Sequence, residues 1–284
     1  MSLQNLPVEL LYEIFMYGQS EHFPHVCHHF YAVFKSAPTS ILSHYLISRH
    51  YGLNLIVKSL RYPFCNESII EAILRDLPSS LNRGDVLWET ELPRRIFRTL
   101  QPKSSSASTS LAGSKRRRGQ TVSGWREDDE PLPFLRFLFN HERLRKPTVN
   151  HCQGYGLTKA VFAGHLPLIR FLLDHGADPG CKDGLAVMVA IKKRDLSLVK
   201  LLIEPDTTPV VDGEEGHDRK RQRTDREKDS KPNRAKRRKL EDRVRINSDM
   251  LKTAVRCDAR DIVEYFMNEK GCVPDMQTLM MMSS

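Results

Sequence analysis

Five side chains that could ligate a metal ion lie within eight residues near the N-terminus: His22, His25, Cys27, His28 and His29. Imidazole and thiolate groups are common zinc ligands, but a zinc site is completed by a second pair or a third ligand at a characteristic spacing. No such pair follows in the sequence. The pattern therefore favours helix surface and helix core over a metal site, and we expect no bound metal.

Catalytic motifs give no better support for chemistry. The six cysteines are scattered without a Cys-x-x-Cys pair, which in an intracellular chain indicates free or buried thiols. Cys27 falls at a packing position, so the neighbouring histidines alone do not make it a nucleophile. The sequence contains no P-loop, no Gly-x-Ser-x-Gly elbow, no His-Glu-x-x-His motif and no Gly-rich dinucleotide turn. We therefore expect a non-catalytic protein without a cofactor.

The distribution of charge says more than its total. The 284-residue chain has a net charge of +9, and its 40% hydrophobic residues are typical of a globular protein. Residues 217–245 contain fourteen Lys or Arg and six Asp or Glu, which gives that segment a net +8. A basic run at 115–118 adds +4, and the remainder carries −3. The basic character therefore belongs to two short segments and not to the fold.

Two basic clusters in these segments have the composition of nuclear import signals: Lys115, Arg116, Arg117 and Arg118, and Lys236, Arg237, Arg238 and Lys239. We expect an import receptor to bind them and the protein to be nuclear or nucleocytoplasmic; a solvated linker without a partner is the alternative. Residues 205–243 include no aromatic side chain, so any contact with nucleic acid would be non-specific phosphate attraction.

Membrane insertion and secretion are both disfavoured by the sequence. It contains no run of eighteen or more apolar residues, so we expect no membrane span. The N-terminus carries Glu9 and Glu13 and lacks a basic stretch followed by an apolar core. We therefore expect no secretory signal and a protein that stays inside the cell.

Apolar periodicity predicts an all-α fold. In residues 1–50, Leu10, Ile14 and Tyr17 fall on one helix face, and two further apolar segments with helical spacing follow. Pro7 suits the first turn of the first helix, where its missing N–H has no helical partner. Residues 1–50 should therefore form a small N-terminal helical module.

The remaining chain divides by composition. Residues 51–100 are predicted to be a helical linker or a degenerate repeat, with Asn66 as the N-cap of one helix. Residues 101–130 and 205–243 are rich in Ser, Gly or charge and have too little apolar content to offset the entropy of ordering. We predict that these two segments are disordered insertions.

Self-comparison reveals an internal repeat within 131–204 and 244–284. Six residues of 132–141 recur at a constant offset of 34: Leu132, Pro133, Arg136, Phe137, Leu138 and His141 return as Leu166, Pro167, Arg170, Phe171, Leu172 and His175. Two more copies follow at 194–204 and 258–268. A shorter segment with a matched alanine precedes each of the last three copies, at Ala160, Ala190 and Ala254. Each unit is therefore predicted to be a short helix, a tight turn and a longer helix.

The spacing of the units locates the insertions. Gly164 and Arg194 are 30 residues apart, whereas Arg194 and Asp258 are 64 apart, which is one repeat plus about thirty residues. The extra length is the basic segment, which should therefore protrude between two units. The first helix expected before Pro131 is missing there, and we place it near 87–100, displaced by the first insertion.

The repeat resembles the ankyrin repeat in three features: Gly164-His165-Leu166, Phe171-Leu172-Leu173 and His175-Gly176-Ala177-Asp178-Pro179. Gly176 would adopt the left-handed conformation that ends the second helix. The family's Thr-Pro-Leu-His opening is replaced by Tyr155-Gly156-Leu157-Thr158, and later copies keep neither it nor the Gly-Ala-Asp turn. The resemblance implies an α-solenoid of degenerate repeats, capped by the N-terminal module.

The N-terminal module is similar to an F-box, which opens with Leu-Pro-x-Glu, continues as an apolar helix and reaches Val-Cys or Val-Ser before an aromatic residue. The matching residues are Leu6-Pro7-Val8-Glu9, Ile14-Phe15 and Val26-Cys27-His28-His29-Phe30. The interval from Ile14 to Val26 is a few residues shorter than usual. Together the resemblances cover about 50 residues at the front and about 145 at the back, an arrangement similar to fungal F-box/ankyrin proteins. The alternative is that this helix only caps the solenoid.

The resemblance implies a substrate-recognition adaptor of a Skp–cullin–F-box ubiquitin ligase, and the alternative is a nuclear ankyrin scaffold without a ligase. The residues expected to bind the Skp-type linker are Leu6, Pro7, Leu10, Ile14 and Phe15. An unidentified protein substrate would contact the ends of the short first helices, where the sequence varies and is partly basic: Phe162, Lys192, Lys193, Arg194 and Arg256. A basic patch there would favour an acidic partner.

Overall fold

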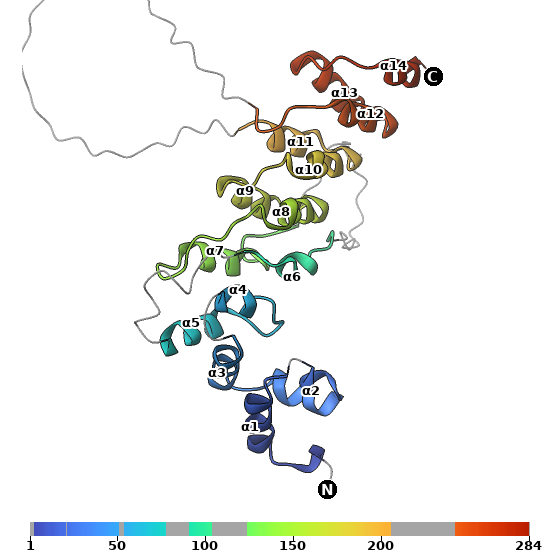
Figure 1. Cartoon of the computed structure of the whole chain (residues 1–284). Coiled ribbons are helices and arrows are strands. Elements are labelled where there is room, and N and C mark those ends of the chain that lie inside the picture. The colour runs from blue at the N-terminus through green and yellow to red at the C-terminus, as the bar shows by residue number, and fades with distance from the viewer. Residues whose placement is uncertain are drawn as a thin grey trace, which may run out of the picture.

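The computed structural model describes residues 3–20, 22–50, 54–77, 91–103, 124–205 and 242–283. Within these residues every regular element is a helix, and one isolated parallel bridge joins Glu91 to Thr148. The helices form an elongated stack with the N- and C-terminal ends of the chain at opposite ends (Figure 1). The predicted all-α solenoid is confirmed.

Three helices form the N-terminal module, as the periodicity predicts: α1 (Val8–Gly18), α2 (His28–Lys35) and α3 (Thr39–Arg49), with short 3-10 turns at Leu3–Asn5 and Phe23–His25. Their core is aromatic. Phe15 stacks on Tyr45 with 3.9 Å between ring centroids and lies 4.2 Å from Phe34. Each of these rings comes from a different helix, so the aromatic contact holds the three helices together.

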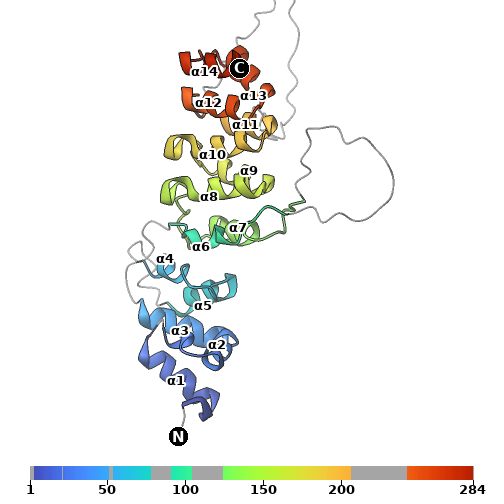
Figure 2. The ribbon, with the colours of Figure 1, turned by 90° about the vertical axis from the view of Figure 1, so that its right-hand side faces the viewer.

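The rest of the stack consists of helix pairs: α4 (Leu55–Ser59) and α5 (Glu67–Asp76), α6 (Arg94–Arg98) and α7 (Leu132–Asn140), α8 (His151–Ala163) and α9 (Leu166–Asp174), α10 (Cys181–Lys192) and α11 (Leu196–Ile203), and α12 (Ser248–Arg256) and α13 (Arg260–Glu264). A π-helical turn, Tyr265–Glu269, continues α13, and α14 (Met276–Ser283) covers α12. Figure 2 shows α8, α10, α12 and α14 in one column and α7, α9, α11 and α13 in the other.

The turns that follow α8, α10 and α12 confirm the predicted repeat register. Gly164, Arg194 and Asp258 all have a positive φ, as expected of the residue that ends a helix in the left-handed conformation. The next amide donates back to the alanine carbonyl five residues earlier in all three units: His165 N to Ala160 O (3.0 Å), Asp195 N to Ala190 O (3.4 Å) and Ala259 N to Ala254 O (3.1 Å). The three alanines are fully buried, so the matched positions are structurally equivalent.

The second helix of four successive pairs buries the same four positions: Ile69, Ile70, Ile73 and Leu74 in α5, Phe134, Leu135, Leu138 and Phe139 in α7, Leu168, Ile169, Leu172 and Leu173 in α9, and Leu198, Val199, Leu202 and Ile203 in α11. The predicted order of a short and then a longer helix is wrong for α8–α9 and α10–α11, because a left-handed turn lengthens α8 and α10 to 13 and 12 residues, against 9 and 8 in α9 and α11. The α5 helix begins at the predicted N-cap, since the Asn66 side chain accepts from the Ile69 amide at 3.0 Å. Residues 54–77 therefore form a repeat-like helix pair.

The displaced first helix is α6, which lies in the segment predicted for it and packs on α8. The Phe97 ring of α6 lies directly under Gly156, where a Cβ would come within 2.8 Å of the ring. The bare backbone of Gly156 therefore makes room for the aromatic ring that joins the α6–α7 unit to the next one.

The helices α8 and α10 both open with a left-handed turn, at 152–154 and 182–184, closed by the Gly154 and Gly184 amides. Each glycine faces the next unit. A Cβ on Gly154 would lie 2.8 Å from the Cβ of Cys181, and one on Gly184 would collide with the Met250 side chain. These turns fix how closely one unit approaches its neighbour.

Both ends of the first predicted insertion are ordered and pack against the stack. The Lys103 ammonium lies 2.7 Å from the Asp129 carboxylate and 4.1 Å from the centre of the Trp125 ring. The indole of Trp125 donates to the carbonyl of Ala163 at 3.1 Å and stacks on His165. Residues 101–103 and 124–130 are therefore part of the stack, while the predicted disorder of 104–123 lies outside the described residues.

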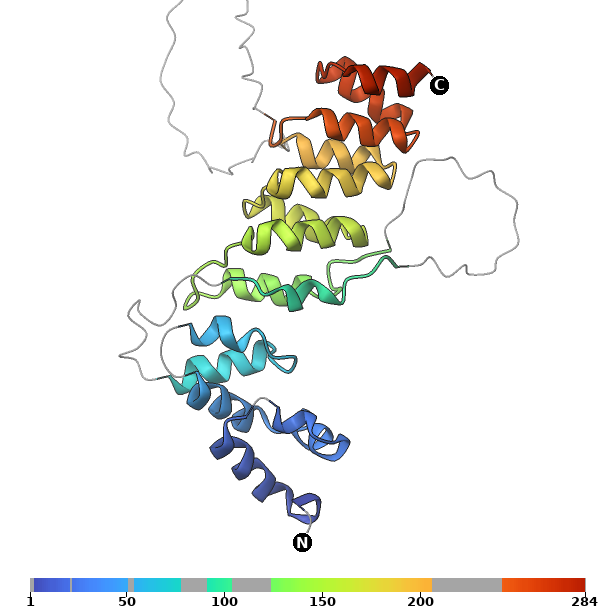
Figure 3. The same ribbon diagram turned by 45° about the vertical axis from the view of Figure 1, so that its right-hand side comes forward.

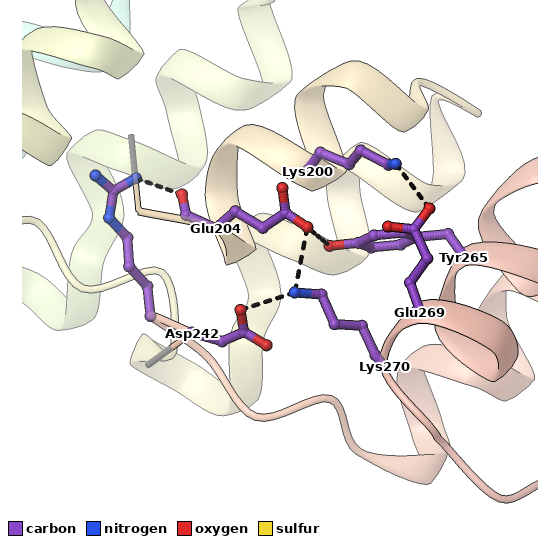
Figure 4. Close-up of polar contacts among 7 residues, drawn as sticks. Lys200, Glu204, Asp242, Tyr265, Glu269 and Lys270 are labelled. Carbon is purple, nitrogen blue, oxygen red and sulfur yellow. Dashed lines mark hydrogen bonds and ion pairs between the residues drawn. The ribbon is translucent and has the colours of Figure 1, made fainter. Parts of the chain in front are cut away.

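The two ends of the second insertion are held together. The Arg243 amide donates to the Ile203 carbonyl at 2.8 Å. The Lys270 ammonium bridges the Glu204 and Asp242 carboxylates at 3.2 and 2.7 Å (Figure 4). The chain therefore leaves and rejoins the stack at one place. The predicted disorder of 206–241 falls outside the described residues.

These contacts of Lys270 with Glu204 and Asp242 (the clasp) are continued by others that join the α10–α11 pair to the α12–α13 pair. The Tyr265 hydroxyl donates to the Glu204 carboxylate at 2.8 Å, and Lys200 pairs with Glu269 at 3.0 Å (Figure 4). Burial and the facing carboxylate of Glu204 raise the pKa of Tyr265 above its usual range, so this hydroxyl remains a donor at neutral pH.

Candidate protein-interaction surfaces

An apolar stripe runs along α1 at the end of the stack and is formed by Leu6, Pro7, Leu10, Ile14 and Tyr17 (the α1 stripe). Leu10 is 44% exposed, Ile14 36% and Tyr17 86%, while Leu6 is half-buried. The opposite side of the helix, with Leu11, faces the core. An isolated exposed leucine is ordinary, but a continuous apolar helix face marks a surface suited to another protein.

The prediction that Phe15 belongs to this docking face is wrong. Its side chain is 1% exposed and lies between the rings of Phe34 and Tyr45. Phe15 lies four residues after Leu11, so the helical period puts both on the core side and leaves Ile14 outside. The α1 stripe therefore keeps four of the five predicted residues and gains Tyr17.

The predicted substrate-binding residues lie at the C-terminal ends of the first helices: Phe162 on α8, Lys192 on α10 and Arg256 on α12, with Lys193 and Arg194 in the turn after α10 (the helix-end patch). Phe162, Lys192 and Arg256 are equivalent in the three units, and all are exposed. Regular stacking thus arranges one variable side chain per unit along one edge of the solenoid.

Within this patch the structure brings Phe162 and Lys193 together. The Lys193 ammonium lies 6.0 Å from the centre of the Phe162 ring, which is 41% exposed. Partial burial lowers the pKa of Lys193, while the charge of Asp195 opposes that shift. Because the ordinary pKa of a lysine lies far above neutrality, the patch presents a cation beside an aromatic face.

The sequence reasoning missed Lys159, whose ammonium lies 5.3 Å from the centre of the same Phe162 ring. The sequence spacing could have identified it, because residues three apart on a helix are neighbours. Phe162 therefore lies between two lysines from adjacent units. An acidic partner with an apolar side chain would match this arrangement of charge and ring.

The histidine cluster is dispersed over the N-terminal module. His22 and His25 lie in and beside the 3-10 turn before α2, and His28 and His29 begin that helix. Over the described part of the chain, no group of three His, Cys, Asp or Glu side chains is arranged to hold a metal ion. Burial raises the pKa of the Cys65 thiol to about 12, so this thiol is not a thiolate at neutral pH.

No helix among the described residues is both long enough and apolar enough to cross a membrane. The import clusters 115–118 and 236–239 lie outside the described residues, so their prediction stands as made.

Comparison with known proteins identifies the middle of the stack. Residues 157–203 match a family model described as ankyrin repeats (many copies). The matched span runs from within α8 to the end of α11 and includes Phe162 and Lys193 of the helix-end patch. No curated protein and no solved structure matches the chain. The chain therefore contains an ankyrin repeat region, a module that mediates binding between proteins.

Proposed function

We propose that this protein is a non-catalytic adaptor that joins a protein target to a Skp–cullin–RING ubiquitin ligase. The observation that carries the proposal is the exposed α1 stripe, which begins at the Leu6-Pro7-Val8-Glu9 motif. It lies at one end of a stack whose middle is an ankyrin repeat region. One end is thus available to a ligase linker while the side of the stack holds a target.

The mechanism requires geometry and no bond-making step. A packed solenoid fixes the distance between the α1 stripe and the helix-end patch, because each unit contacts only its neighbours. Binding at both surfaces raises the concentration of target lysines near the ligase's charged conjugating enzyme. The basic helix-end patch and the ring of Phe162 favour an acidic target segment with an apolar side chain.

The experiment measures binding of a purified Skp-type linker by isothermal titration calorimetry. Leu10 and Ile14 are each worth about 1.5–3 kcal/mol when fully buried, and both start partly exposed. Replacing both by Asp should therefore abolish measurable binding without touching the core. A matched control replaces Val273 and Met276 by Asp, since these exposed apolar residues lie at the other end of the stack. Equal linker affinity of the wild-type and stripe variants would refute the F-box part of the proposal.

We also propose that the basic clusters at 115–118 and 236–239 direct the protein to the nucleus. The clasp between Glu204, Asp242 and Lys270 holds the ends of the second insertion, so residues 206–241 can be removed without opening the stack. The deleted, fluorescently tagged protein should move to the cytoplasm with unchanged helical circular dichroism. Unchanged nuclear accumulation would overturn the role of 236–239.

The second candidate function is a nuclear ankyrin scaffold with no ligase link, and the two basic clusters are the observation that favours it. The measurements above separate the two candidates. Nuclear accumulation without any linker binding would support the scaffold, whereas linker binding lost with the α1 stripe supports the adaptor.

A further inference from the structure

A groove of about 910 Å³ lies between the N-terminal module and the first helix pair. One wall comes from the turn before α2 and from α2 itself, and the other from Lys58 on α4 and the turn that follows it. Figure 3 shows α3 between the α2 helix and the α4–α5 pair. The volume is within the range of sites that enclose a ligand or a peptide side chain, about 300–1,000 Å³.

The floor of the groove is apolar and built from the core of the module. Phe34, Leu42 and Tyr45 are buried there, and the buried Ile69 of α5 also lines the groove. Tyr31, which also lines the groove, is 46% exposed. A ligand side chain that reached this floor would therefore leave water for aromatic and aliphatic contacts.

The rim of the groove is cationic. Among the described residues that line it, the charged side chains are Lys35, Lys58 and Arg61, and none is an Asp or Glu. Lys35, Lys58 and Arg61 are exposed and come from both walls. This one-signed lining contrasts with the net charge of −3 outside the two basic segments, and it selects for a negatively charged ligand.

The two walls are held in place by contacts of their own. The His50 imidazole lies 3.1 Å from the Tyr62 hydroxyl, and the Tyr62 ring packs edge-on against Tyr45 and lies 5.3 Å from Phe64. On the opposite wall, the Lys35 ammonium lies 5.9 Å from the centre of the Tyr31 ring. The groove is thus formed before any ligand arrives, which limits the entropy lost on binding.

We infer that this groove binds an acidic peptide segment that carries one apolar anchor side chain. The anchor would occupy the floor beside Phe34 and Leu42, and carboxylates on either side of it would face Lys35, Lys58 and Arg61. A peptide is favoured over single-stranded nucleic acid because the floor takes a side chain from above, whereas nucleic-acid channels stack successive bases along an extended track. The site is separate from the α1 stripe and the helix-end patch, so it adds a third surface to the proposed function.

The test starts from a display library of random twelve-residue peptides selected on the immobilised full-length protein. The most enriched peptide is then made with a fluorescein label, and its affinity is measured by fluorescence anisotropy. Enriched peptides should contain an aromatic or aliphatic residue flanked by Asp or Glu. Binding should weaken as salt is added, since exposed charges at the rim are screened.

Three variants localise the site. Reversing Lys35, Lys58 and Arg61 to Glu should weaken binding at least tenfold, and Thr39→Trp, which fills the groove from an exposed lining position, should do the same without a change of charge. The matched control reverses three exposed cations far from the groove: Lys146, Arg170 and Lys182 to Glu. This control should change affinity less than twofold, and circular dichroism should be the same for all.

The inference is overturned by selection of no peptide, by selection of peptides without acidic residues, or by equal binding of the groove and control variants. Unlabelled oligothymidylate and unlabelled peptide are then compared as competitors of the labelled peptide. If oligothymidylate displaces it at the lower concentration, the groove binds nucleic acid instead. The groove variants should still bind the Skp-type linker in calorimetry, because the α1 stripe is intact. Failure of the groove is thereby distinguished from failure of the adaptor proposal.

Discussion

Replacing Gly184 by alanine should destabilise the stack by about 2 kcal/mol, from two separate causes. The backbone has φ +73° at this position, and the left-handed region costs an L-residue roughly 1–2 kcal/mol. Alanine also restricts the unfolded chain more than glycine does, and this lower entropy of the unfolded state offsets about 0.4–1 kcal/mol of the cost. The new Cβ also collides with Met250, which is 1% exposed. Because the colliding atom is the flexible end of that side chain, overpacking should add only about 1 kcal/mol.

Two controls separate these causes. Gly176 has φ +82° and open space where a Cβ would lie, so Gly176→Ala should show the backbone cost alone, about 1 kcal/mol. In a Met250→Ala background, Gly184→Ala should fall to the same value. The assay is urea unfolding followed by far-ultraviolet circular dichroism. Equal costs at Gly184 and Gly176 in the wild-type background would refute the close contact between the α10 turn and α12.

Three further predictions concern the stack. Ala190→Leu should cost about 1–3 kcal/mol by overpacking a fully buried position, whereas Ala32→Leu on the exposed side of α2 should be near neutral; equal thermal shifts would refute the repeat register. Arg194→Gly should stabilise by about 1 kcal/mol in urea unfolding, because Arg194 holds φ 56°; destabilisation would contradict that conformation. The Lys252 ammonium and the hydrogen bonds from Thr278 lower the pKa of Asp275 to about 2, so its stabilising contribution is present above pH 4 and is lost between about pH 4 and pH 2. Asp275→Asn should therefore reduce the fall of the melting temperature between about pH 4 and pH 2. An unchanged fall would count against this contact.

The repeat register could be predicted because it depends on positions where packing or backbone conformation restricts the choice of residue. The alanines at 160, 190 and 254 are required wherever a helix end packs closely, and the residue four places later must turn left-handed. The sequence offsets therefore translated directly into equivalent hydrogen bonds. The non-glycine residues Arg194 and Asp258 weakened the family signal without changing the geometry.

The first helix pair was harder to recognise for a local reason. Its second helix, α5, buries the same four positions as α9, but it ends at Leu77 in an extended conformation and lacks the Gly176 turn. Without that turn, residues 54–77 resemble any amphipathic helix. The role of Trp125 was missed for another reason: one partly buried ring hardly changes the average composition of a Ser-rich segment.

Some of the candidate surfaces could likewise be predicted from the sequence, and others could not. Leu10 and Ile14 follow from the helical period, and the same period explains why Phe15 was misassigned when the apolar stripe was drawn too wide. The groove has no local signal at all. Its rim joins Lys35 to Arg61 across two helices, and only the packing of the module on the next pair brings them together.

The adaptor proposal is tested most directly by quantitative mass spectrometry of the proteins that co-purify with the tagged chain and two variants. The stripe variant replaces Leu10 and Ile14 by Asp, and the patch variant replaces Lys192, Lys193 and Arg256 by Glu. We expect the stripe variant to lose the Skp–cullin subunits and keep the other partners, and the patch variant to show the reverse. If the Skp–cullin subunits are missing from the wild-type sample, or if they persist with the stripe variant, the chain is not the bridge proposed.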